Sequence, residues 1–153
     1  MSRIPTPATI DAAPAAWRPL LEGVKKQLGV VPNLFRLVAN SPVALESYLA
    51  ISGALAKGAL PAPTRERIAL AVAELNGCSY CLSAHAYLGK NLAKLDDAEI
   101  AANRGGGSHD PKADAAVRFA VKVVCEHGHV GEEDLRTVKA AGGRPTSNRG
   151  ASP

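Results

Sequence analysis

The chain has 153 residues, enough for one domain and too few for two of ordinary size, and its hydrophobic fraction of 46% supports a packed core. The net charge of +4 comes from scattered lysines and arginines, without basic runs interleaved with aromatic residues, which argues against nucleic-acid binding. No apolar stretch approaches the roughly 20 residues of a membrane span, and the N-terminal residues lack the apolar core of a signal peptide. We therefore expect a cytoplasmic protein that binds neither nucleic acid nor a membrane.

The first third of the chain predicts an irregular lead-in followed by helices. Aromatic residues make up only 4% of the chain, so the core must consist mainly of Ala, Leu and Val, which favours helices. Residues 1–16 are rich in Pro and Ala and predict no regular element. Apolar residues recur at helical spacing over 17–28, and Gly29 follows as a stop signal. Ser41 then predicts the start of another helix over about 42–51.

The middle of the chain predicts two helices joined by a short turn. The segment GALPAP at residues 58–63 is a clear break. Thr64 after it is expected to cap a helix that ends at Asn76-Gly77, and a second helix is expected from about Cys78 to Leu92.

The last third predicts a short turn, a flexible segment and two further helices. Asp96 or Asp97 is expected to cap the turn, and RGGGSHDP at residues 104–111 is expected to be flexible. Helical spacing recurs over 113–126 and 132–140, and no segment shows the two-residue alternation of a strand. The predicted fold is all-α. The predicted organisation is an irregular lead-in over residues 1–16, a helical domain over residues 17–142 and a disordered tail over residues 143–153.

The sequence NGCSYCLSAH contains the candidate site. Cys78 follows the turn signal Asn76-Gly77, so we expect it at a helix N-terminus, where backbone amides and the helix dipole lower the pKa of a thiol. Cys81 lies one turn further along and His85 four residues beyond it, so all three share one helical face. Two thiols and an imidazole are the minimum equipment for reducing a peroxide or exchanging a disulfide.

Two other interpretations use the same residues. The cysteines could be small buried side chains, or they could bind zinc together with His85 and a fourth ligand from Cys125, His127 or His129. Structural zinc sites usually pair two short chelating loops, and a second Cys pair is missing here. We therefore favour thiol chemistry and expect neither a metal nor a cofactor. Cys125 itself is expected to be a buried small residue.

A carboxylate that could assist these residues is not singled out by spacing alone. Glu66 lies between Arg65 and Arg67 in a predicted first helical turn, where it is typically a solvated partner of the helix dipole. Glu74 is nearer to Cys78 in the sequence.

The run ERIALAVAELNGCSYCLSAH resembles the alkylhydroperoxidase D (AhpD)-like branch of the carboxymuconolactone decarboxylase superfamily. The signature of that branch is Glu, eleven residues, Cys-x-x-Cys, three residues and His. Glu66, Cys78, Cys81 and His85 match it position by position, and the resemblance extends over roughly residues 30–142.

This resemblance implies a compact AhpD-like helical bundle, usually a homo-oligomer, that reduces hydroperoxides through a dithiol–disulfide cycle with a thiol or dithiol reductant protein. By the same resemblance Cys81 attacks the peroxide, Cys78 resolves the product, His85 relays a proton, and Glu66 is the final base or orients the imidazole. The helix N-terminus instead favours the thiolate at Cys78, so the physical argument points to the other cysteine.

The sequence departs from its relatives at two places. Tyr80 stands where the best-studied members have a second histidine, and with a pKa near 10 a tyrosine shuttles protons less readily at neutral pH. After Gly142 similar proteins continue into an amphipathic helix, whereas this chain continues as GRPTSNRGASP. A non-enzymatic zinc-binding or redox-sensing module remains the alternative, and the intact CxxC argues against the lactone decarboxylase chemistry of the other branch.

Overall fold

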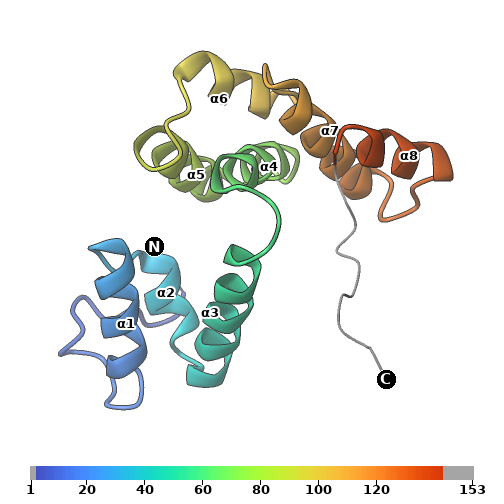
Figure 1. Ribbon diagram of the computed structural model, residues 1–153. Helices are drawn as coiled ribbons and strands as arrows, with labels where there is room; N and C mark the ends of the chain where they lie inside the picture. Colours follow the sequence, from blue (N-terminus) through green and yellow to red (C-terminus); the bar gives the residue numbers. More distant parts are fainter. Residues whose placement is uncertain (1–2, 143–153) are drawn as a thin grey trace, which may run out of the picture. The chain divides into compact units, whose positions relative to one another are not determined.

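The computed structural model describes residues 3–142, and every regular element among them is a helix (Figure 1). The all-α class predicted from composition and periodicity is confirmed. The chain divides into two units, residues 1–58 and 59–153, and each is described below by itself. Residues 1–2 and the predicted disordered tail, 143–153, lie outside the described residues.

The first and third helices of the first unit begin close to the predicted positions, but the third continues to Ala56, beyond the predicted end near residue 51. Gly29 ends the first helix with a left-handed φ of 76°, a conformation that glycine adopts without steric cost. Ser41 caps the third helix by accepting a hydrogen bond from the amide of Ala44, as expected. The three helices are α1 (Arg18–Leu28), α2 (Asn33–Val38) and α3 (Pro42–Ala56).

The core of the first unit is built from these helices and the irregular segment before them. Residues 3–16 contain no helix, but two long-range hydrogen bonds hold them in place. Arg36 Nη1 donates to the carbonyl of Ala8 at 2.7 Å, and Asn40 Nδ2 donates to that of Pro5 at 3.0 Å. The buried core residues are Ala13, Leu21, Val24, Val31, Ala39 and Leu45.

The second unit is organised around one central helix, α4. This helix contacts α5, α6 and α7, while α8 packs against α7 (Figure 1). Leu70 of α4 and Val117 of α7 are fully buried, as expected for the helices that form the core. The helices are α4 (Ala62–Leu75), α5 (Ser79–Asn91), α6 (Asp97–Arg104), α7 (Pro111–Cys125) and α8 (Glu132–Ala140).

The start of α4 differs from the prediction. Pro61 is the N-cap, without a side-chain hydrogen bond, and Thr64 is buried inside the helix, so the predicted Thr64 cap is wrong. A proline in the first turn lacks an N–H that would have had no helical partner, so Pro63 is accommodated and α4 begins earlier. Glu66 consequently lies in the second turn of α4 instead of the first.

The segment 104–111, predicted to be flexible, is held by hydrogen bonds. The amide of Ser108 donates to Asp114 Oδ1 at 2.8 Å, which ties the segment to α7. Asp110 caps α7, which begins at Pro111, two residues earlier than predicted. The glycines that suggested flexibility therefore belong to an ordered connection.

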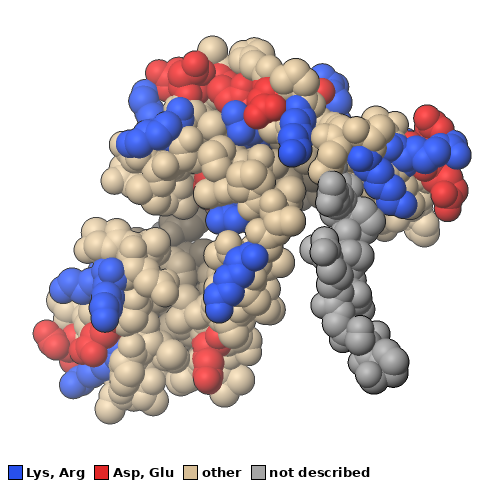
Figure 2. Space-filling view, in the orientation of Figure 1, with Lys and Arg blue, Asp and Glu red and all other residues tan. Residues whose placement is uncertain are grey.

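Charged side chains of the second unit gather over α6 and α8 (Figure 2). In the same view, few of them lie over α4 and α5. None of the helices in the described range is both long and apolar enough to cross a membrane.

Candidate functional site

Helices α4 and α5 bring Glu66 and His85 together. His85 Nδ1 donates a hydrogen bond to Glu66 Oε2 at 2.8 Å, and the two side chains are 33% and 22% exposed. An ionised carboxylate only accepts hydrogen bonds, so this contact places a proton on Nδ1 of the imidazole. In the neutral ring Nε2 then carries the lone pair and can accept a proton from another group.

The two cysteines of the CxxC pair lie at the start of α5 and form a disulfide, with Cα atoms 5.3 Å apart. Cys78 is the N-cap of the helix, as predicted, and its Sγ accepts a hydrogen bond from the amide of Cys81 at 3.2 Å. A sulfur at this position is exposed to the positive end of the helix dipole, which would stabilise negative charge on Cys78 after reduction.

The turn before Cys78 depends on a left-handed residue. Gly77 has a φ of 60°, and the amide of Cys78 after it donates to the carbonyl of Ala73 at 3.0 Å. This bond closes the end of α4 in the manner of a Schellman motif. Gly77 thus sets the point at which the chain leaves α4 and begins α5.

Replacing Gly77 by Ala is expected to lower the free energy of unfolding by about 1 kcal/mol, because a Cβ is unfavourable in the left-handed region. Urea unfolding of the two proteins measures this difference. Gly53→Ala is the control: Gly53 lies within α3, and a Cβ there would meet nothing within 4 Å. That change should leave the stability unchanged or raise it. Equal losses in both variants would contradict the prediction.

The carboxylate nearer to Cys78 in sequence, Glu74, is engaged elsewhere. Arg104 Nε of α6 donates to Glu74 Oε2 at 2.6 Å, and this hydrogen bond lowers the pKa of the Glu74 carboxyl. The pair is largely exposed. Tyr80, which stands between the two cysteines, is 46% exposed.

Cys125 is exposed and outside any disulfide, so its predicted burial is wrong. It is the last residue of α7. In the described part of the chain, no three His, Cys, Asp or Glu side chains are grouped as a metal site requires. Among these residues, Cys78, Cys81 and His85 are therefore not grouped with a fourth ligand from Cys125, His127 or His129.

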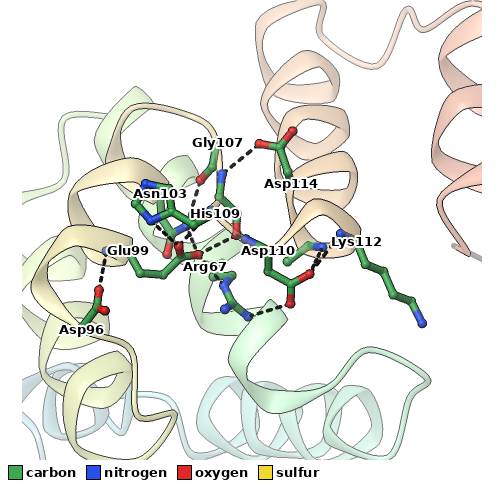
Figure 3. Close-up of polar contacts among 11 residues, drawn as sticks. Arg67, Asp96, Glu99, Asn103, Gly107, His109, Asp110, Lys112 and Asp114 are labelled. Atoms are coloured by element: carbon green, nitrogen blue, oxygen red, sulfur yellow. Dashed lines mark hydrogen bonds and ion pairs between the residues drawn. The ribbon is translucent and has the colours of Figure 1, made fainter.

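A second polar cluster, which sequence reasoning missed, surrounds Glu99 of α6 (Figure 3). The Glu99 residue is 6% exposed. Its Oε1 accepts hydrogen bonds from Arg67 Nε at 2.7 Å, Ser108 Oγ at 2.5 Å and Asn103 Nδ2 at 3.0 Å. Its Oε2 accepts from the backbone amide of His109 at 2.9 Å. We refer to Arg67, Glu99, Asn103, Ser108 and His109 as the Glu99 cluster.

The cluster keeps Glu99 ionised despite its burial. Burial raises the pKa of the carboxyl, but hydrogen bonds from Ser108, Asn103, the His109 amide and Arg67 outweigh it and lower the pKa to about 2. The sequence held one usable signal: Asp110-Pro111 is a typical helix start, which implies an ordered chain just before it.

The family is established by a sequence comparison. The model of the family "Carboxymuconolactone decarboxylase family" matches residues 42–123, which is more than half of the chain. The chain belongs to the carboxymuconolactone decarboxylase family. An uncharacterised protein of Haemophilus influenzae is 41% identical to this chain over 71 residues. The match covers 46% of the chain and 58% of the relative.

Two solved structures resemble this carboxymuconolactone decarboxylase family protein. One, from Ralstonia eutropha JMP134, is described as an alkylhydroperoxidase AhpD core and an uncharacterised peroxidase-related protein. It is 30% identical, with a TM-score of 0.78, over 92% of this chain and 76% of its own. The other, a peroxidase-related protein from Silicibacter sp. TM1040, is 24% identical with a TM-score of 0.77, over 94% and 80%, and supports the fold alone. The predicted AhpD-like assignment is thereby confirmed.

Proposed function

We propose that this protein is a thiol-dependent peroxidase that reduces hydroperoxides through a dithiol–disulfide cycle of Cys78 and Cys81. The observation that carries the proposal is that α5 presents the cysteine pair and, one turn later, His85 with its Nδ1 bonded to Glu66. The peroxidase-related description of the structural neighbours adds support.

The proposed cycle begins with the reduced pair. A thiolate attacks one peroxide oxygen, the O–O bond breaks, and the departing alkoxide takes up a proton and leaves as an alcohol. The attacking cysteine becomes a sulfenic acid. The second thiolate then attacks that sulfur, which forms the S–S bond and releases hydroxide, protonated to water. An external thiol or dithiol protein supplies two electrons and two protons to restore the pair.

Glu66 and His85 supply the proton handling in this proposal. With Nδ1 bonded to Glu66, the Nε2 of His85 accepts the proton of a cysteine thiol, directly or through a water molecule. By family resemblance Cys81 is the attacking thiol and Cys78 the resolving thiol. The N-cap position of Cys78 favours the opposite order, because the amide of Cys81 stabilises its sulfur.

We infer that the protein acts in the cytoplasm, where a reducing environment regenerates the pair, and that it assembles into a homo-oligomer, as the resemblance to the AhpD-like branch implies. Exposed Leu75 and Tyr80, which flank the cysteine turn, offer apolar surface to an organic hydroperoxide or a reductant protein.

Mass spectrometry of the purified protein tests the proposal. The reduced chain receives one equivalent of an organic hydroperoxide and is then mapped by peptides without reduction. We expect a loss of two hydrogens within the peptide that contains Cys78 and Cys81, and their return on treatment with a dithiol. If both thiols remain reduced after the hydroperoxide is added, the peroxidase function is refuted. Stoichiometric zinc in native mass spectra would favour the alternative, a zinc-binding or redox-sensing module built on Cys78, Cys81 and His85.

A further inference from the structure

We propose that Glu99, acting through Arg67, is a positioning residue that holds the Glu66 carboxylate against His85. This inference rests on the proposed function, since it assigns the Glu66–His85 pair a part in turnover. It concerns residues outside the signature by which the family was recognised.

Glu66 and Arg67 are neighbours on α4. Consecutive residues of a helix project about 100° apart. Glu66 reaches His85 of α5, whereas Arg67 reaches Glu99 of α6. The two bonds therefore fix the same turn of α4 from two sides, and a rotation of α4 about its axis would lengthen both.

The Glu99 cluster is buried and densely hydrogen-bonded, which holds its side chains in place. Arg67 and Glu99 side chains are 14% and 8% exposed, so water competes little for their hydrogen bond. Asn103 donates both of its amide hydrogens, one to Glu99 within the cluster and one to the carbonyl of Gly107 beside it. Its Oδ1 is buried and has no hydrogen-bond partner in the described chain, which is unfavourable. The same orientation keeps the Nδ2 donor toward Glu99.

A second ion pair between the same two helices provides a comparison. Glu74 and Arg104 also join α4 to α6, at 2.6 Å, but two turns further along α4 and largely exposed to solvent. Exposed pairs of this kind contribute little to stability or rigidity. If any ion pair between α4 and α6 could hold Glu66 against His85, loss of either pair would have the same effect on turnover. The positioning role instead predicts an effect only for the pair that includes Arg67, beside Glu66.

Glu99→Gln tests the proposal, because it removes the charge and turns one acceptor oxygen into a donor facing other donors. The first readout is the imidazole Nδ1–H resonance of His85 in nitrogen-edited NMR spectra of the reduced protein, without peroxide. We expect it to broaden or shift toward its state in Glu66→Ala, which lacks the acceptor. The second readout is steady-state hydroperoxide reduction, in which kcat falls about tenfold while KM stays within about twofold. The matched control, Glu74→Gln, should change neither.

The outcomes separate this proposal from the proposed function. A folded Glu99→Gln protein with wild-type resonance and wild-type kcat overturns the positioning role. If Glu99→Gln fails to fold, Ser108→Ala, which removes one donor to Glu99, takes its place and should give a smaller change of the same kind; no change there overturns the proposal as well. A wild-type protein without hydroperoxide turnover, whose His85 resonance still responds to Glu99→Gln, refutes the peroxidase function while supporting the positioning role.

Discussion

Cys81→Ser is expected to lower hydroperoxide turnover at least about a thousandfold, because the cycle needs two sulfurs and a serine hydroxyl neither attacks a peroxide nor forms a disulfide. Cys78→Ser should lose steady-state turnover as well. The two variants differ in a single turnover: the one that retains the attacking thiol still consumes one equivalent of peroxide. A peroxide assay on each reduced variant measures both quantities and decides between the family-based order and the order that the N-cap position favours.

The third cysteine supplies the control for this experiment. Cys125 is exposed at the end of α7 and takes no part in the disulfide, so Cys125→Ser should keep wild-type turnover. Retained turnover in Cys81→Ser would refute the peroxidase cycle. A comparable loss in Cys125→Ser would show that chemistry at α5 alone does not account for activity.

The second large effect concerns stability in acid. A Glu99 pKa lowered from 4.5 to about 2 corresponds to about 3 kcal/mol of stability. Because the folded-state pKa is the lower one, this contribution is complete above about pH 4.5 and is lost as the pH falls toward 2. About 2 kcal/mol of it should disappear between pH 7 and pH 3. Urea unfolding of the wild type and Glu99→Gln at both pH values measures the difference.

The comparison with Glu99→Gln is needed because other carboxyls also titrate in this range. Asp114 and Asp134 have lowered pKa values too, and Asp96 and Asp110 lie in or beside the Glu99 cluster. These groups remain in both proteins, so most of their contributions cancel when the pH dependences are subtracted. Asp114 adds a small difference, because the Glu99 charge raises its pKa in the wild type only. Glu74→Gln should lose only a small part of the wild-type pH dependence, because the lowered pKa of Glu74 belongs to an exposed ion pair. An unchanged slope in Glu99→Gln would show that Glu99 is not held in its ionised state by the cluster.

The helices were predictable because their signals are local. Caps and stop signals at Gly29, Ser41 and Cys78 depend on neighbouring residues only, and each was found where expected. The predicted Thr64 cap was wrong for an equally local reason. Pro63 is compatible with the first turn of a helix, so α4 begins before Thr64.

The contacts between helices were less accessible from the sequence. Spacing gave no reason to prefer Glu66, which faces His85, over Glu74, which faces Arg104, and family resemblance made that choice. Glu99 was missed because a glutamate in the first turn of a helix is ordinarily a dipole partner. Its burial follows from where residues 104–111 fold, and that path is set by tertiary hydrogen bonds.

The hydrogen bond from the Cys81 amide to Cys78 Sγ has a practical consequence. The donor is a backbone proton that every NMR spectrum of the labelled protein records, and its acceptor is one of the two sulfurs that change oxidation state. A disulfide sulfur and a thiolate are hydrogen-bond acceptors of different strength, so they deshield that proton to different degrees. The cross-peak of residue 81 is therefore a built-in redox indicator, which needs neither a dye nor a coupled enzyme to follow the pair in real time.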